Sequence, residues 1–428
     1  MVTLEGLLEA YYDCRVRKSR TNNCIGFTVN MESQLCEMVE AINNRRYSPR
    51  SSICFVVTRP KFREVFAADF ADRIVHHYLR LRLEPLMEAM FNDRTYNCRQ
   101  GKGTLAGVRQ LEQDIRECSE NYTKDCWVCK VDIKSFFMSI SKLEVERLVT
   151  DFVNKYYFGN DKDDVLYLCH VILSHCPEKN CTKQSSENMW SYLPKSKSLF
   201  TCGEGNGMPI GNLPSQMFAN YLLNDVDWAI ENEGGIPLHG RYVDDIYLVD
   251  KDKEKILKTI PIIREKLKKH GLTLSHDKFY LQHYSKGVTF TGTVVKPGRT
   301  YAMNRQVESF KYSIICLNKC RHRREVEREL FRVNSYLGVM RQADSYAIRR
   351  EILGMIKPYI FHWCYIKGHF EAVILKKRYR REEQIKYRCV RGWDYPLRLP
   401  KPIMEVGERC DDKYIRRIEN YEPTKFNI

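Results

Sequence analysis

Two adjacent aspartates, Asp244 and Asp245, interrupt the apolar stretch HGRYVDDIYLVD at residues 239–250. The apolar residues on either side predict two strands joined by a turn that carries both carboxylates. Like charges beside a buried strand repel each other, and desolvation increases the cost, so we expect a positive partner to neutralise them. The alternative is a simple tight turn in which Asp245 is solvated.

A third carboxylate, Asp132, lies in another apolar run, WVCKVDIKSFF, which predicts a strand over 127–137. If the strands are neighbours, Asp132 stands beside the Asp244–Asp245 turn. Three converging carboxylates fit two divalent cations about 3.5–4 Å apart, the arrangement that catalyses in-line phosphoryl transfer. Mg²⁺ prefers such oxygen ligands. We therefore predict a site for two Mg²⁺ ions that includes Ile133, with Mn²⁺ as a substitute.

The charge of the chain indicates a polyanionic partner. The 428 residues carry a formal net charge of +16 and are 43% hydrophobic, enough for two or three subdomains with a core. The excess of positive charge favours nucleic acid first and an acidic membrane surface second. The N-terminal sequence lacks an apolar signal core, and nothing reads as membrane-spanning. We expect a cytoplasmic protein.

We do not expect the 17 cysteines to form a disulfide framework, because their number is odd and their spacing scattered. Two clusters are candidates for zinc: CWVC at 126–129 and CHVILSHCPEKNC at 169–181. The first runs into an apolar strand, and the second lacks two clean pairs of ligands. We expect reduced thiols.

The pattern of apolar and polar residues predicts the elements in the rest of the chain. Residues 1–50 are helical and basic, 53–58 form a strand, and 178–207 are a long polar loop. A helix starts near Pro214 and continues to about Ile230. Further expected elements are a helix at 142–157, a helix at 253–270, a strand at 288–295 and a basic helical region at 304–375.

The motifs together resemble the reverse transcriptase family. Tyr242-Val243-Asp244-Asp245 matches the Tyr-x-Asp-Asp signature of these enzymes, and Asp132 matches the first catalytic aspartate of their palm. Four other blocks resemble the family in the same order: DRTYNCRQGKGT (93–104), GMPIGNLPSQMFANYLL (207–223), LTLSHDKFYLQ (272–282) and VTFTGTVV (288–295). The resemblance covers about residues 50–300.

The resemblance implies an α+β right-hand polymerase with fingers, a palm whose antiparallel sheet packs on helices, and a helical thumb. The expected activity is RNA-directed DNA synthesis, with template RNA, primer or cDNA, and deoxynucleoside triphosphates as partners. The expected division is an N-terminal basic helical segment (1–50), fingers (51–130), palm with part of the fingers and the loop 178–207 (131–300), thumb (301–380) and a C-terminal tail (381–428).

The residues around Ile210 indicate which branch of the reverse transcriptase family this chain resembles. Most reverse transcriptases have Gln-Gly and Ser-Pro where this chain has Ile210-Gly211 and Ser215-Gln216. This form is similar to the reverse transcriptases of diversity-generating retroelements in bacteria and phages. These enzymes copy a template-repeat RNA into cDNA with errors at adenines to diversify a target gene. They work with a small, basic, oligomeric accessory variability protein.

The resemblance assigns seven nucleotide-binding residues. Phe137 matches an aromatic steric gate against a ribose 2′-hydroxyl, and its alternative is a core aromatic. Lys61 and Arg63 match the residues that hold the triphosphate, although Lys61 also fits a solvated basic loop. Lys278 matches a proton donor to pyrophosphate, or else a surface lysine. The full set is Lys61, Arg63, Phe137, Ile210, Gly211, Gln216 and Lys278.

Ile210 cannot make the hydrogen bonds of a glutamine, which weakens discrimination against mispairs. Its alternative is simple packing. Gly211 would let the substrate approach the backbone. The residues expected at template and primer are Arg99, Lys102, Tyr242 and Gly292, and the basic helices from 305 would follow the duplex backbone by phosphate contacts.

Three rival interpretations stay open. A group II intron or retron reverse transcriptase shares the same motifs, and a phage-defence enzyme with untemplated polymerisation also alters the middle block. A non-catalytic RNA-binding protein on a polymerase fold would be favoured by loss of a metal carboxylate, and all three are present.

Overall fold

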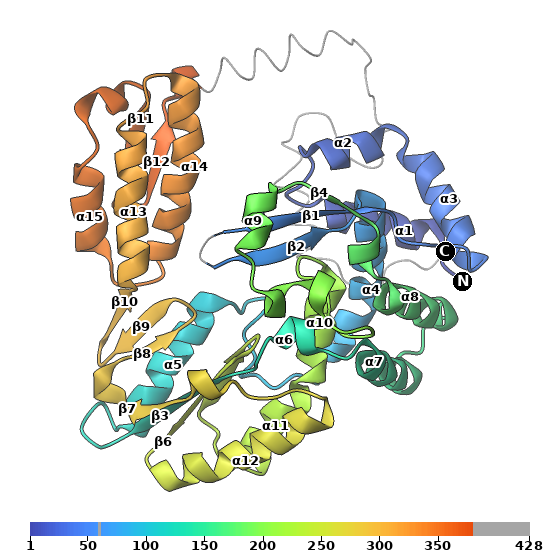
Figure 1. Ribbon diagram of the computed structural model, residues 1–428, viewed down its shortest axis with the longest axis horizontal. Helices are drawn as coiled ribbons and strands as arrows, with labels where there is room; N and C mark the ends of the chain where they lie inside the picture. Colours follow the sequence, from blue (N-terminus) through green and yellow to red (C-terminus); the bar gives the residue numbers. More distant parts are fainter. Residues whose placement is uncertain (59–60, 380–428) are drawn as a thin grey trace, which may run out of the picture.

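The computed structural model describes residues 1–58 and 61–379 and is built around a four-stranded antiparallel sheet (Figure 1). The strands lie in the order β5–β6–β3–β7. Their bounds are β3 Trp127–Asp132, β5 His239–Tyr242, β6 Asp245–Asp250 and β7 Tyr280–His283. The predicted α+β class with an antiparallel sheet is confirmed.

Side chains alternate between the two faces of this sheet. One face is apolar and shares a core with the helices α10 (Leu213–Leu222), α11 (Asn224–Asn232) and α12 (Lys253–Lys269). The other face is apolar only at one end, where it packs on α5 (Thr104–Cys118) and on the hairpin β8 (Val288–Phe290)–β9 (Thr293–Lys296). Toward the other end this second face carries charged residues, which opens it to polar ligands.

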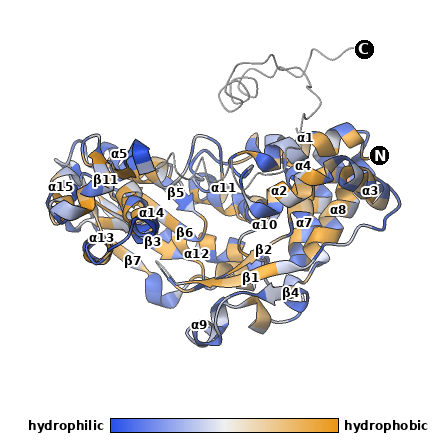
Figure 2. Cartoon of the chain, turned by 90° about the horizontal axis from the view of Figure 1, so that it is seen from above, coloured by the Kyte–Doolittle hydropathy of each residue, from blue (hydrophilic) through white to orange (hydrophobic). Residues whose placement is uncertain are grey.

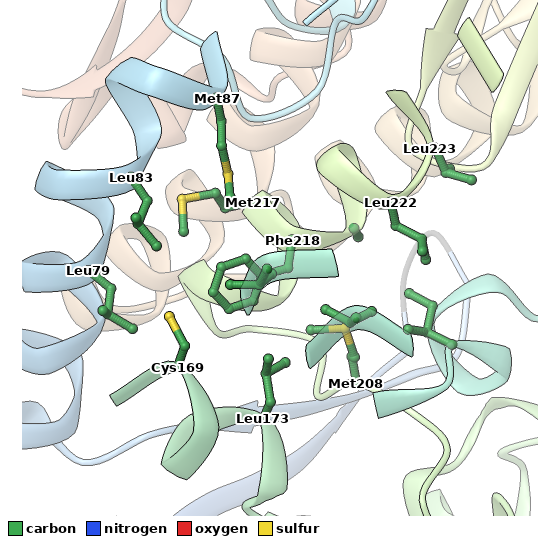
Figure 3. Packing of buried hydrophobic residues seen from close by; sticks show 14 of the residues in the cluster. Leu79, Leu83, Met87, Cys169, Leu173, Met208, Met217, Phe218, Leu222 and Leu223 are labelled. Carbon is green, nitrogen blue, oxygen red and sulfur yellow. The ribbon is translucent and has the colours of Figure 1, made fainter. Parts of the chain in front are cut away.

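A group of helices shares the core on the apolar face of the sheet. They are α1 Leu4–Arg15, α2 Asn22–Val29, α3 Met31–Asn43, α4 Phe70–Glu88, α7 Lys142–Tyr156 and α8 Lys162–Ser174. Figure 3 shows Phe218 of α10 between apolar side chains of α4 and α8. Phe218 is fully buried, and burial of such a side chain stabilises the fold by about 1.5–3 kcal/mol.

A second sheet lies beside these helices. It has the order β2–β1–β4, with bounds β1 Ser52–Val57, β2 Arg63–Ala67 and β4 Cys181–Lys183. Figure 2 shows the central strand β1 as hydrophobic along most of its length. The prediction that 178–207 is a loop was wrong in part, because β4 pairs in parallel with β1. The segment also contains η1 Pro177–Lys179, α9 Glu187–Ser191, η2 Lys195–Lys197 and η3 Leu199–Thr201.

The C-terminal part of the described chain has its own apolar core and stands apart from the N-terminal helices (Figure 1). It contains α13 Asn304–Leu317, α14 Arg323–Met340, α15 Tyr346–Gly354 and η6 Pro358–His362. The prediction of helix as far as residue 375 was wrong, because β11 (Cys364–Lys367) and β12 (Ala372–Leu375) form a hairpin there. The predicted tail at 381–428 lies outside the described residues.

Three other expectations need correction. The strand predicted over 127–137 ends at Asp132, and a short helix, α6 (Phe136–Ser139), follows. The backbone changes partners there: Lys134 N–H donates to the Thr273 carbonyl, and the Ser275 N–H donates to the Asp132 carbonyl. The helix predicted from Pro214 is broken at Leu223 into α10 and α11.

The expected strand at 288–295 is the hairpin β8–β9, and β10 (Arg299–Ala302) extends it. The short helices η4 (His276–Lys278) and η5 (Tyr284–Lys286) flank β7. In the part of the chain that the structure describes, no helix combines the length and apolar character needed to cross a bilayer.

Candidate active site

The end of β3 brings Asp132 beside the aspartate pair. Asp132 lies directly opposite Asp245 in the antiparallel register of β3 and β6. Opposite residues on paired strands share a face and have Cβ atoms about 4.5–5.5 Å apart. The Ile133 N–H donates to the Asp244 carbonyl at 3.1 Å, which ties the turn to the strand. The predicted convergence of the two strands is therefore present.

Asp244 is the carboxylate most affected by this convergence. Burial and the charges of Asp132 and Asp245 raise the pKa of Asp244 to about 6. The effect is expected when like charges converge in a partly desolvated place. The tight turn of the alternative interpretation is present, but its Asp245 is only partly exposed and lies beside Lys130.

Two lysines neutralise part of the negative charge. Lys278 Nζ lies 2.5 Å from Asp132 Oδ1, and Lys130 Nζ lies 3.1 Å from Asp245 Oδ1. Lys130 precedes Asp132 by two residues on β3, so strand periodicity places both on one face. Sequence reasoning missed Lys130, although this spacing could have revealed it. No ion pair with Asp244 occurs in the described residues.

The turn that presents the aspartates is strained. Val243 has a φ of +59°, in the left-handed region that β-branched residues avoid. Such conformations cost about 1–3 kcal/mol and persist where the surroundings hold them. The Val243 N–H donates to Asn97 Oδ1 at 2.9 Å, and its carbonyl accepts from Arg241 at 3.3 Å. Neither Asn97 nor Arg241 was predicted as a site residue.

The donor set fits a hard divalent cation. Its side-chain ligands are carboxylate oxygens, and the apolar side chain of Ile133 is fully buried, so only its backbone could contribute. Within residues 1–58 and 61–379, no three His, Cys, Asp or Glu side chains form a ready-made metal cage. Mg²⁺ is commonly held by one or two carboxylates together with water and substrate phosphates. A site completed by substrate is consistent with this arrangement.

The residues predicted to contact the triphosphate lie on the second sheet. Lys61 and Arg63 are exposed, and Arg63 begins β2 opposite Val57. Burial raises the pKa of Tyr242, and the positive charge of Arg63 opposes this rise. The phosphate contacts of Lys61 and Arg63 stay predictions.

Phe137 and Ile210 border one small apolar cluster. Phe137 lies on α6, is half-buried and packs against Phe136 at a ring-centroid distance of 5.3 Å. Both Phe137 and Ile210 contact the cluster formed by Cys54, Phe66, Met138 and Leu199. Ile210 therefore packs, as its structural alternative proposed, and this packing does not test its influence on fidelity.

Gly211 is required by the protein backbone itself. Its φ is +117°, and a Cβ there would lie 2.7 Å from the Phe66 carbonyl oxygen of β2. The adjacent Ile210 carbonyl accepts from the Phe66 N–H at 2.8 Å. The close approach that demands glycine is thus with β2, which is a different reason from the predicted approach of substrate.

Three other predicted residues are held by protein contacts. Arg99 is buried, with Nε 2.8 Å from Glu88, and Lys102 forms an ion pair with Asp93 at 3.2 Å. Gln216 of α10 accepts a hydrogen bond from Cys98. Their contacts with nucleotide or template stay predictions.

Gly292 lies in the β8–β9 turn with a φ of +90°, where a Cβ would come within 2.9 Å of Gln306 on α13. The positive φ is what favours glycine at this turn, because the Gln306 side chain could move aside. Its contact with primer stays a prediction.

The CWVC cysteines do not form a metal site together. Cys126 belongs to the core on one face of the sheet and Cys129 to the core on the other face. Both are fully buried. A spacing of three residues on a strand places side chains on opposite faces, which explains the separation.

Comparisons with known proteins agree with this geometry. The model of the family "Reverse transcriptase (RNA-dependent DNA polymerase)" matches residues 58–295, more than half of the 428 residues. The match contains all three aspartates. A search of curated protein sequences finds no match.

Solved structures with some similarity include two telomerases. Apo telomerase from Candida tropicalis has a TM-score of 0.45 and 14% identity over 73% of this chain and 56% of that one. Telomerase from Candida albicans in complex with a fragment of telomeric RNA has a TM-score of 0.43 and 12% identity over 73% and 55%. A Candida tropicalis form truncated from the C-terminal domain has a TM-score of 0.42 and 14% identity over 64% and 60%.

This chain thus spans 55–60% of the length of those telomerases. The assignment rests on the family match together with the paired aspartate strands. The chain belongs to the reverse transcriptase family of RNA-dependent DNA polymerases.

Proposed function

We propose that this protein is an RNA-directed DNA polymerase whose reaction takes place at Asp132, Asp244 and Asp245. The observation that carries the proposal is the direct pairing of Asp132 with Asp245 across β3 and β6, beside a half-buried Asp244 that forms no ion pair in the described residues. Strands that converge three carboxylates without full neutralisation favour cation binding over a purely structural role.

The three aspartates would hold two divalent cations, Mg²⁺ first. Cations bound there lower the pKa of the attacking 3′-hydroxyl and stabilise the pyrophosphate leaving group. Lys278, now 2.5 Å from Asp132, would move to the leaving pyrophosphate and give it a proton. Arg63 would bind the triphosphate with its guanidinium fork, and Lys61 would add a second positive charge.

The elements support the expected division of the polymerase hand. The sheet β2–β1–β4 would belong to the fingers (51–130 and part of 131–300), the β5–β6–β3–β7 sheet to the palm, and α13–α15 to the thumb. Pairing of β4 with β1 supports a fingers segment inserted within the palm sequence. The basic thumb helices would follow the backbone of the template–primer duplex.

Primer extension tests the proposal. The assay uses a defined RNA template, a DNA primer, Mg²⁺ and four deoxynucleotides, with Asp132→Asn as the inactive variant. Asp250→Asn is the matched control, because Asp250 ends the neighbouring strand β6 and pairs with Lys255, at the end of β6 that lies away from the turn. We expect extension by the wild type and by Asp250→Asn only. No extension by a folded wild type, also with its own RNA and accessory protein, would favour the non-catalytic alternative.

We further propose that the enzyme belongs to a diversity-generating retroelement and copies a template-repeat RNA with errors at adenines. Support comes from the apolar Ile210, which lies between the two aspartate strands in sequence, at a position where a glutamine could hydrogen-bond the nucleotide. In this role a small basic accessory variability protein is the expected partner, and the cytoplasm of a bacterial or phage-infected cell is the expected location.

Sequencing of the cDNA tests this finer proposal. We expect errors of the wild type to concentrate opposite template adenines, and Ile210→Gln to lower them. Ile210→Val is the matched control, since it keeps an apolar side chain against the same cluster. An unchanged error spectrum in Ile210→Gln would remove the role of Ile210, and faithful copying by the wild type would remove the retroelement assignment.

A substitution at Phe137 tests the steric gate. Phe137→Val opens space below the sugar, so incorporation of ribonucleotides relative to deoxynucleotides should rise by about 10-fold or more, roughly 1.4 kcal/mol of discrimination. Phe137→Tyr keeps the ring and should retain discrimination. If Phe137→Val discriminates as well as the wild type, Phe137 is only a packing residue.

A further inference from the structure

The Tyr-x-Asp-Asp turn rests on a fully buried polar network. Arg241 has no exposed surface, and its guanidinium forms two bonds to Asp227, Nε to Oδ1 at 2.8 Å and Nη2 to Oδ2 at 2.7 Å. Asp227 lies on α11 and also accepts from the Thr95 hydroxyl at 2.7 Å. A bidentate pair of this kind fixes the orientation of the guanidinium.

The other terminal nitrogen of Arg241, Nη1, points at the turn. Its Nη1 donates to the Val243 carbonyl at 3.3 Å and to Asn220 Oδ1 at 3.3 Å. Asn97 completes the arrangement, because its Oδ1 accepts from the Val243 N–H at 2.9 Å while its Nδ2 donates to Asn220 at 2.6 Å. Both polar groups of the Val243 residue are therefore held by buried side chains.

The segment before α5 supplies half of this network. Residues 94–96 lie along the free edge of β5: the Arg241 N–H donates to the Arg94 carbonyl at 2.9 Å, and the Tyr96 N–H donates to the Arg241 carbonyl at 2.9 Å. This pairing delivers Asn97 beneath the turn, 146 residues away in sequence from Val243. A residue outside the palm strands thus reaches the turn that carries the aspartate pair.

The network explains how a valine is kept in the left-handed region. With φ at +59°, Val243 adopts a conformation that a β-branched residue leaves unless its backbone groups are held. We infer that Asn97 and Arg241 are positioning residues that hold the Val243 peptide and thereby aim Asp244 and Asp245 for the reaction. The inference rests on the proposed polymerase function for its catalytic consequence, and on the hydrogen bonds alone for its structural one.

A double-mutant cycle between Asn97 and Val243 tests the inference. Glycine adopts positive φ without a Cβ penalty. Val243→Gly therefore removes the need for the clamp, by which we mean the hydrogen bonds of Asn97 and Arg241 to the backbone of residue 243. We expect Asn97→Ala to slow single-nucleotide incorporation at saturating substrate by about 30-fold or more, and to slow it by less than about 5-fold in the Val243→Gly background. A role limited to stability gives equal losses in both backgrounds and overturns the inference.

The control is Asn92→Ala. Asn92 is equally buried in the same segment and bonds Glu231 and the Arg94 N–H, but it has no bond to Val243. Its loss should not be rescued by Val243→Gly. Rescue of Asn92→Ala to the same extent would show a general effect of glycine and contradict the clamp.

Thermal unfolding tests the same double-mutant cycle through the melting temperature, without an activity assay. The fall in melting temperature caused by Asn97→Ala should be smaller by about 2 °C or more in the Val243→Gly background. Absence of this coupling overturns the clamp, whereas an inactive wild type with the coupling present overturns only the polymerase proposal. If Asn97→Ala does not fold, Arg241→Lys replaces it, since lysine keeps the charge for Asp227 but lacks the fork that reaches Val243.

Discussion

Asp227 and Asp244 lie in neighbouring parts of the molecule, but their carboxylates have opposite environments. Asp227 is fully buried and receives three hydrogen bonds of 2.7–2.8 Å from Arg241 and Thr95. Asp244 is half-buried, and two further aspartates face it. Arg241, which neutralises the first, stands only three residues before the second.

This difference in neutralisation distinguishes a structural carboxylate from one that can bind a cation. A buried carboxylate whose acceptors are all satisfied holds elements together, here α11 to β5. A carboxylate left short of positive charge destabilises the free protein but can accept a cation. The lysines beside Asp132 and Asp245 neutralise the site only in part, which leaves it ready for exchange with metal.

Removal of the buried partner should give the largest effect on stability. Arg241→Leu leaves Asp227 as an uncompensated buried charge, so the free energy of unfolding should fall by about 3–5 kcal/mol in urea titrations. Lys269→Gln, which breaks the exposed Lys269–Glu265 pair, should change it by less than about 0.5 kcal/mol. A loss below about 1 kcal/mol in Arg241→Leu would erase the contrast between the two aspartates.

The raised pKa of Asp244 predicts a pH-dependent stability of the metal-free protein. Its folded pKa of about 6 exceeds the ordinary value of 3.8, so the folded state binds the proton more tightly. Its contribution to stability is therefore present below about pH 4 and is lost as pH rises through 6. Relative to Asp244→Asn, the wild type should lose about 1–3 kcal/mol between pH 4 and 7.

Urea unfolding of both proteins in the presence of a chelator, at several pH values, measures this difference. Titration of groups that do not interact with Asp244 cancels between wild type and variant. A difference that stays constant across the range would mean that Asp244 is as well neutralised as Asp227.

The smallest effect is expected at Lys130. Its pair with Asp245 is partly exposed, so Lys130→Gln should change the free energy of unfolding by less than about 1 kcal/mol. The Mg²⁺ concentration for half-maximal extension should fall a few-fold, since the lysine no longer competes for Asp245. A metal titration and a urea titration check the two statements. A stability loss above about 2 kcal/mol would class Lys130 with Arg241 as a structural partner.

The parts of the site that follow from local patterning were predictable. Apolar runs ending in aspartate indicated the strands β3 and β6, and the Tyr-x-Asp-Asp motif indicated their turn. The end of β3 at Asp132 was missed, because the apolar run continues to Phe137 while the backbone changes its hydrogen-bond partners.

The buried network was not predictable, because its partners are distant in sequence. Asp227 in NDVDWAI has the pattern of a solvated helix residue, and Asn97 lies in a polar segment that looks like a loop. Only the folded chain shows that these two meet Arg241 and the turn. The same holds for β4, whose three residues form a strand only because β1 is beside them.

Single-nucleotide incorporation by Asp244→Asn, with thermal unfolding of the same sample, tests the central claim most directly. Asparagine keeps the shape and removes the charge that would hold metal. Loss of several kcal/mol of transition-state stabilisation corresponds to about a thousandfold or greater fall in rate. We predict that fall together with a melting temperature equal to or above that of the wild type. Incorporation within about tenfold of the wild type would contradict the assignment of Asp244 to the reaction.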